Sequence, residues 1–272
     1  MTWLTAFSAN QFVLFTLVLT RVSGVVIGTP IYGSIEVPAR VRAFLAVALA
    51  VLMMPTQWHT IVEQPANVVD FALLVAAELL IGLTLGTGTL ILFSGVQLAG
   101  HIISQIGGMS LGEALDPNTD NSVPILSELL RMFALAIFVA IGGHRLVLAG
   151  LLGTFEAIPA GQAQLATSLG QLLSVLLTES LSLGVRMAAP AMTALLLATL
   201  VLGLVSRTVP QLNVFSLGFA LNAVTLFVAV ALSLGGIAWL FEDQVPSLLN
   251  DLLDAILESQ SAVSAAGWPA HG

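Results

Sequence analysis

The sequence predicts an all-α membrane protein, and three observations support that fold class. Only 8% of the 272 residues are Asp, Glu, Lys or Arg, whereas soluble domains contain about 25%. The mean hydropathy is +1.02. Most apolar runs are about 17 to 28 residues long, enough to cross a bilayer core of roughly 30 Å, and they lack the short alternating segments of a membrane β-barrel.

Proline, glycine and polar residues divide the chain into a series of expected helices. In order, these cover residues 12–28, 41–54, 68–93, 94–106, 125–141, 165–187, 188–205 and 214–241. The segment 94–106 is more amphipathic than the others, and 142–161 is expected to break the helical pattern. The helices on either side of Pro190 are expected to meet there.

The domain organisation is expected to be simple. We find no internal repeat and no soluble second domain, which predicts one helical domain over residues 1–241. Residues 242–272 form an acidic tail that is expected to be partly helical or disordered, with an amphipathic helix at 247–257. The N-terminus lacks the basic segment of a cleaved signal peptide, so the first apolar run is expected to be retained as a helix of the mature protein.

Charge and cysteine content exclude several classes of function. All seven cations are arginine, fifteen acids bring the net charge to −8, and there is no cysteine. This balance argues against nucleic acid as a partner and against docking on anionic lipid through basic patches. The absence of cysteine excludes disulfides and thiol chemistry.

The positive-inside rule gives no consistent topology. If the loop with Arg40 and Arg42 is cytoplasmic, alternating crossings place Arg186 inside but Arg145 and Arg207 outside. Either the number of segments differs from the one expected, or some helices do not cross the bilayer.

Ionisable side chains lie inside the apolar runs, where one charge costs about 2.5–3.5 kcal/mol on insertion scales. Glu128 and Arg131 are three residues apart and can pair on one helix face. Arg21 has no local partner and is expected to reach an acid on another helix or subunit. Buried structural pairs are the favoured interpretation, and the lining of a polar pore or proton path is the alternative. The residues expected to be buried polar or to meet other subunits are Arg21, Glu78, Glu128, Arg131, Glu179 and Arg186.

Two short motifs place glycines one turn apart on helix faces. These are GVVIG, with Gly24 and Gly28, and GLTLG, with Gly82 and Gly86. Such spacing permits close helix contact in a membrane.

No combination of residues indicates an enzyme. The zinc motif HExxH and a P-loop are absent, and the one string of the form GxSxG, residues 108–112, follows an expected helix and not the strand that a serine elbow requires. The four histidines, His59, His101, His144 and His271, have no neighbouring ligand at metal spacing, and His144 is expected to be structural at a helix end. The sequence therefore predicts a non-enzymatic protein without a metal or cofactor.

The turn RTVPQLN, residues 207–213, has the features of a capped hairpin. Arg207 suits the carbonyl end of a helix, Pro210 stops that helix, and Asn213 can cap the next one from Val214. Gln211 remains available to bond the backbone or a neighbour.

The longer stretch SRTVPQLNVFSLGF, residues 206–219, resembles the hairpin of the FliR family of flagellar biosynthetic proteins. That family also includes the R/T-type subunit of virulence type III secretion systems. The sequence PQLNVF, residues 210–215, favours the flagellar branch. Further matching stretches follow the family order over roughly residues 10–240. They are RVSGVVIGTPIYGSIEVPARVR, QLAGHIISQIGGMSLGEALDPNTDNSVP, GGHRLVLAGLLGTFEAIP and RMAAPAMTALLLATLVLGLVSRTVPQLNVF.

The resemblance implies a pore-forming subunit of the flagellar-type protein export gate at the basal body. The implied partners are P-type and Q-type subunits, the B-type export switch protein, exported flagellar proteins in transit, and membrane lipid. The implied place is the bacterial inner membrane and its periplasmic side, with some helices not crossing the bilayer conventionally. An alternative function is a small secondary transporter coupled through Glu78, Glu128 or Arg131, which would be expected to show paired internal repeats.

The resemblance also implies a loop that plugs the closed channel, by position residues 106–121. Glycine freedom and low local stability suit a segment that must move aside, and Met109 and Leu111 can form an apolar seal. An ordinary loop between helices is the alternative. The expected plug residues are Ile106, Gly107, Gly108, Met109, Ser110, Leu111 and Gly112.

Overall fold

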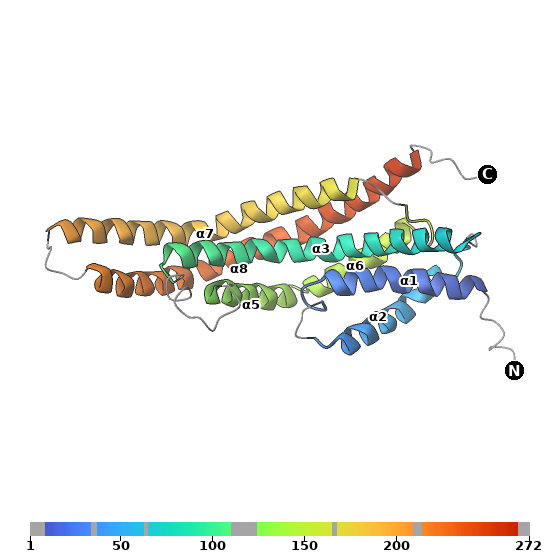
Figure 1. Cartoon of the computed structure of the whole chain (residues 1–272), viewed down its shortest axis with the longest axis horizontal. Helices are drawn as coiled ribbons and strands as arrows, with labels where there is room; N and C mark the ends of the chain where they lie inside the picture. Colours follow the sequence, from blue (N-terminus) through green and yellow to red (C-terminus); the bar gives the residue numbers. More distant parts are fainter. Residues whose placement is uncertain are drawn as a thin grey trace. The chain divides into compact units, whose positions relative to one another are not determined.

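The structure is a computed structural model that describes residues 9–33, 37–62, 65–109, 124–164, 168–208 and 214–265. All regular structure in these ranges is helical (Figure 1), which confirms the all-α prediction. The helices are α1 Ala9–Gly28, α2 Ala39–Met53, the short 3-10 helix η1 Met54–Gln57, α3 Val68–Ile106, α5 Ile125–Ala140, α6 Gly143–Ala157, α7 Ser168–Thr208 and α8 Val214–Ala265.

Two expected helix breaks are absent. The segments 68–93 and 94–106 form one helix, α3, of 39 residues. The segments that were expected to meet near Pro190 form one helix, α7, of 41 residues. Proline removes one backbone hydrogen bond, and long apolar helices tolerate this loss where neighbouring groups compensate.

A missed helix and an extended helix also correct the sequence prediction. The segment 142–161, expected to break the pattern, contains α6, which begins after Gly142 in a left-handed conformation with φ of 76°. The helix α8 continues through the expected boundary at residue 241 to Ala265, so the helix at 247–257 is part of a longer one.

The chain divides into two compact units. The first unit comprises Met1–Ile91, Gly142–Leu176 and Pro246–Gly272, and the second comprises Leu92–Ile141 and Leu177–Val245. Helices α3, α7 and α8 therefore each contribute residues to both units.

In the first unit, α1 buries one face at helical spacing. Leu14, Leu17, Val18, Val22 and Val25 are each at most 1% exposed, as expected for the buried stripe of a helix with 3.6 residues per turn.

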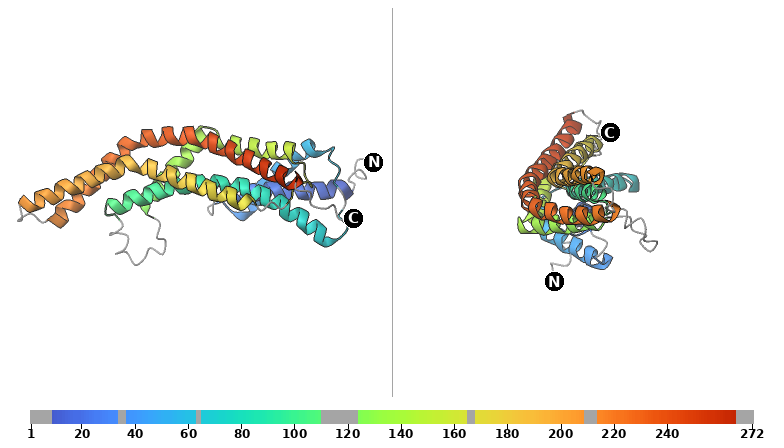
Figure 2. Two further views of the ribbon diagram at one scale, coloured as in Figure 1. Left: turned by 90° about the horizontal axis from the view of Figure 1, so that it is seen from above. Right: turned by 90° about the vertical axis from the view of Figure 1, so that its left-hand side faces the viewer.

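The glycines of α1 and α3 meet where the two helices run side by side (Figures 1 and 2). A Cβ atom on Gly24 would lie 2.7 Å from the backbone N of Leu83, and one on Gly28 would lie 2.8 Å from Cα of Gly86. These distances leave no space for a side chain, so the two glycine motifs lie at a close helix contact of the kind that their spacing permits.

The second unit is built around aromatic and small residues. Phe93 packs edge-on against Phe138 and Phe241, with ring centroids 5.3 Å and 5.6 Å apart. A Cβ atom on Gly95 of α3 would overlap the backbone carbonyl oxygen of Ser180 on α7. Aromatic rings thus fill the wide part of this core, and glycine permits the close approach of α3 and α7.

Among the described residues, four helices are long and apolar enough to cross a membrane, or up to six if two pairs of consecutive helical segments are each counted as one span. The four are Asn10–Gly28, Ala39–Gln57, Val68–Ile106 and Leu172–Thr208. Only 22% of the apolar stretch of α7 is buried within the chain, compared with 50% for α1. The remaining apolar surface requires lipid or other protein as a neighbour.

Substitution of Gly82 by alanine should separate α1 from α3, because the new Cβ would overlap the carbonyl oxygen of Arg21. We expect a loss of about 1–3 kcal/mol of unfolding free energy, as for other overpacked cores. The matched control is Gly153→Ala in α6, where a Cβ meets nothing within 4 Å. Thermal unfolding of the detergent-solubilised chain measures both, and equal midpoints for the two variants would contradict the close crossing.

Candidate functional site

A buried ion pair joins the first and third helices. Nε of Arg21 on α1 donates to Oε2 of Glu78 on α3 at 2.6 Å, and both side chains are 0% exposed. Glu78 is therefore the acid on another helix that Arg21 was expected to reach. An isolated charge in such a place is very costly, so the remaining polar atoms of the pair must also be considered.

The end of α6 completes the partners of the pair. Nη1 of Arg21 donates to the carbonyl oxygens of Thr154 at 3.0 Å and Ile158 at 2.9 Å. The guanidinium also lies 4.3 Å from the ring centroid of Phe155, in reach of a cation–π contact. Oε1 of Glu78 accepts from the backbone N–H of Gly161 at 2.8 Å.

The last carbonyls of a helix lack intrahelical partners and carry partial negative charge. Arg21 supplies both hydrogen-bond donors and positive charge at the end of α6. Its Nη2 atom is the part of the guanidinium that has no hydrogen-bond partner among the described residues.

Gln57 holds the same turn from the side of η1. Its Nε2 donates to the carbonyl oxygen of Phe155 at 3.2 Å, and its Oε1 accepts from the N–H of Ala160 at 3.1 Å. Gly161, with φ of 89°, permits the left-handed conformation that turns the chain here. The turn after α6 is thus fixed by side chains from α1, η1 and α3.

The hydrogen bonds accepted by both Glu78 oxygens favour the structural interpretation of this pair over a proton path. Each oxygen already accepts a hydrogen bond, one from Arg21 and one from Gly161. A coupling carboxylate must exchange protons with its surroundings, and burial at 0% exposure denies Glu78 that access.

The other ionisable residues singled out by the sequence lie elsewhere. Arg131 and Glu128 form a local pair on α5, with Nε donating to Oε2 at 2.9 Å, and both side chains are partly exposed. Glu179 and Arg186 are exposed on α7 and are not brought to the Arg21–Glu78 pair. Any role of these two residues at a subunit contact stays a prediction.

The expected plug begins at a capped helix end. Gly108 N–H donates to the carbonyl oxygen of Gln105 at 3.2 Å, and Met109 N–H donates to that of Ser104 at 3.1 Å. With Gly108 at φ of 78°, this is the Schellman motif that ends many helices. Ile106 is the last residue of α3, and Gly107 is buried. The expected plug residues Ser110, Leu111 and Gly112 lie outside the described residues.

The hairpin motif is described only at its first residue. Arg207 is exposed in the last turn of α7. Helix α7 ends at Thr208, three residues beyond the expected end at residue 205, and α8 begins at Val214 as the sequence predicted. Pro210, Gln211 and Asn213 lie outside the described residues. Within the described part of the chain, no group of three or more His, Asp or Glu side chains is placed to hold a metal ion.

Sequence reasoning missed the contribution of Gln57, Phe155 and Gly161. Its only available signals were the glycine and proline of the segment AIPAG, residues 157–161, which indicated a turn but not what the turn would contact.

Long apolar helices joined by close glycine contacts and a buried ion pair define an all-α membrane protein. Within that class, the chain matches the family model described as bacterial export proteins, family 1, over residues 12–248. The chain belongs to this family, in agreement with the resemblance found in its motifs.

Three similar proteins carry the name flagellar biosynthetic protein FliR. The one from Caulobacter vibrioides is 29% identical, with 89% of this chain and 97% of that protein covered. The one from Bacillus subtilis is 32% identical, with coverages of 80% and 85%. The one from Escherichia coli is also 32% identical, with coverages of 88% and 91%.

Replacement of Arg21 by methionine should leave Glu78 buried without its partner, a change that typically costs about 3–5 kcal/mol. The double variant Arg21→Met/Glu78→Met should recover a large part of this loss, because apolar residues often replace a buried pair without penalty. The control is Arg40→Gln at the exposed start of α2, expected within about 0.5 kcal/mol. A double variant that unfolds as early as Arg21→Met, in the same detergent assay, would contradict the pairing.

Gly108→Val should weaken the end of α3, because a left-handed conformation costs an L-residue about 1–2 kcal/mol. Gly108→Asn should cost less, since asparagine tolerates this conformation better. Hydrogen–deuterium exchange at the Met109 amide reports the cap directly, and it should be fastest in the valine variant. Equal exchange in the wild type and Gly108→Val would show that the cap does not depend on positive φ.

Proposed function

We propose that the chain is a pore-forming core subunit of the flagellar-type protein export gate and that it assembles with P-type and Q-type subunits around the channel for unfolded export substrates. The observation that carries this proposal is the family match over residues 12–248, together with relatives that carry a flagellar biosynthetic name and align along most of their length. The role we propose is non-enzymatic and needs no cofactor.

The exposed surface supports a role inside an assembly. Large apolar side chains on the second half of α7 and the start of α8 are open to the surroundings, including Leu197 at 63%, Leu204 at 67%, Val224 at 62% and Phe227 at 63% exposed. In a conduit subunit, such faces contact sister subunits as well as lipid. Glu179, exposed on α7, is our candidate for a polar contact with a sister subunit.

We place the subunit in the inner membrane and on its periplasmic side at the basal body, with the B-type export switch protein as a further partner. Some of its helices then do not cross the bilayer, which accounts for the inconsistent positive-inside pattern of Arg145 and Arg207. The segment after Met109 is our candidate for the channel plug, anchored by the glycine cap of α3.

Coexpression tests the proposed assembly. The chain purified alone in mild detergent should be unstable, with a low unfolding temperature, whereas coexpression with P-type and Q-type subunits should give one stable complex that contains it. A homogeneous monomer that transports a small solute in proteoliposomes, with no complex on coexpression, would instead favour a secondary transporter.

Export itself tests the function in a strain deleted for the gene. The wild-type chain and Arg40→Gln should restore release of filament protein into the medium, and Arg21→Met should not. Full release of filament protein from the deletion strain would refute the proposal.

A further inference from the structure

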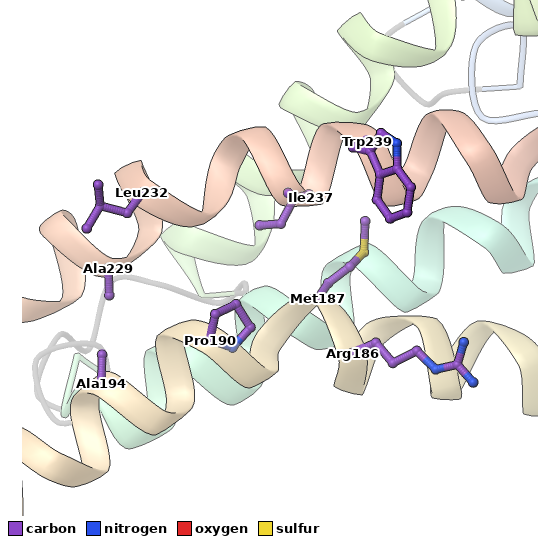
Figure 3. Close-up of a pocket in the computed structure, with 9 residues that line it drawn as sticks. Arg186, Met187, Pro190, Ala194, Ala229, Leu232, Ile237 and Trp239 are labelled. Atoms are coloured by element: carbon purple, nitrogen blue, oxygen red, sulfur yellow. The ribbon is translucent and has the colours of Figure 1, made fainter.

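The two halves of α8 expose different kinds of side chain. Between residues 220 and 239, in the second unit, the described residues that are exposed are apolar or glycine, with Leu232 at 81% and Trp239 at 66% exposed. Figure 3 shows these two side chains on the part of α8 that runs beside α7. Five acids and no basic residue follow between Glu242 and Glu258. The second half of α8 is therefore suited to different surroundings from the first.

Three of these acids lie on one face of the second half of α8. Asp251, Asp254 and Glu258 are exposed and lie three and four residues apart, a spacing that places side chains on the same face of a helix. The opposite face is apolar and buried, with Leu252 at 1% and Ile256 at 0% exposed. This half of α8 is thus an amphipathic helix, and we call its exposed face the acidic stripe.

Two glycines of other helices fix the rotation of the acidic stripe within the first unit. A Cβ atom on Gly88 of α3 would lie 2.5 Å from Cδ2 of Leu252, and one on Gly150 of α6 would lie 3.1 Å from Cδ1 of Leu253. The two leucine side chains therefore occupy the space that the glycines leave free. Because α8 is held against two helices in this way, it cannot turn the acidic stripe inward without losing both contacts.

Gly88 also gives the level of the acidic stripe along α3. It lies twenty residues after Val68 and eighteen before Ile106, in the middle of this helix. With 39 residues at 1.5 Å each, α3 is about 58 Å long, whereas a bilayer core is roughly 30 Å thick. Part of α3 therefore extends beyond the hydrocarbon wherever the helix is placed, and its length alone does not say which part.

The charges of the acidic stripe distinguish between the possible placements. No ion pair joins Asp251 or Asp254 to an arginine among the residues that the structure describes. If lipid covered this face at the level of Gly88, exposed carboxylates would lie in hydrocarbon, where each charge is costly. Several such charges would cost a free energy comparable with the stability of a whole domain.

We infer that the acidic stripe of α8 faces water, so that the hydrocarbon core does not cover this side of the first unit at the level of Gly88. The inference rests on the fixed rotation of α8 and on the charge of its exposed face. It concerns the chain by itself and does not rest on the proposed export role, since both a surface outside the bilayer and the wall of an aqueous conduit would satisfy it.

Cysteine labelling tests this inference, because the chain contains no cysteine of its own. The full-length variants Asp254→Cys, Leu197→Cys and Ser259→Cys are placed in opened membrane vesicles from cells without the other export-gate genes, so that no sister subunit covers the stripe. The probe is a sulfonated maleimide, which does not enter hydrocarbon. We expect Asp254→Cys to react about tenfold or more faster than the other two variants, because the reactive thiolate forms readily in water and not in apolar surroundings.

The two comparison positions separate exposure to water from exposure to lipid. Leu197 is 63% exposed within the apolar stretch Leu172–Thr208, so its thiol reports a face open to lipid. Ser259 is 6% exposed on the buried face of α8, and serine to cysteine is a small change. Ser259→Cys should react only after denaturation in dodecyl sulfate, which shows that α8 is packed in the membrane.

A nitroxide attached to Asp254→Cys and Leu197→Cys provides a second measurement. Collisions with a water-soluble nickel chelate should exceed those with oxygen at position 254, and the reverse should hold at position 197. Labelling of Asp254→Cys as slow as that of Leu197→Cys, or a preference for oxygen at position 254, would overturn the inference. Rapid labelling of Ser259→Cys in native membranes would also overturn it, because the rotation of α8 would then not be fixed.

Discussion

The buried pair of Arg21 and Glu78 is the interaction on which the rest of the first unit depends. Neither charge is tolerable in an apolar interior unless its polar atoms are met, and the groups that meet them come from α6 and the turn that follows it. A buried pair adds little net stability over well-packed apolar residues. We infer that its value here lies in selecting which helices become neighbours.

Close backbone contact and charge pairing occur on the same helix faces. Gly24 lies three residues after Arg21, and Gly82 lies four residues after Glu78, so each glycine is one turn from a member of the pair. The glycines bring α1 and α3 close enough for backbone contact, and the pair then forms beside that contact. The two features therefore support each other, and neither motif in isolation would specify the arrangement.

Sequence patterns predicted the structural features that depend on neighbouring residues in the chain. Helix ends at Gly28, Ile106 and Thr208 coincide with glycine or proline residues, and the glycine motifs indicated that their helices could approach a neighbour closely, without showing which one. Arg21 was expected to need an acid as its partner. Asp70, Glu128 and Glu179 also lie within apolar runs of the sequence, so only the folded chain shows that Glu78 is that partner. Helix α6 was missed because its segment contains five glycines and a proline, while the contacts that stabilise its end come from distant residues. Pro190 indicated a break that the long helix α7 absorbs.

The spacing of the buried pair along the chain has a consequence for biosynthesis. Glu78 follows Arg21 by 57 residues, and Thr154 follows by 133. When α1 emerges from the ribosome, no partner for its arginine has yet been translated. Release of this helix alone into the bilayer core would leave the Arg21 cation there without a partner. Retention of α1 at the translocon, or hydration of Arg21 until α3 arrives, would avoid this cost, and the centre can close only after α6 has been made.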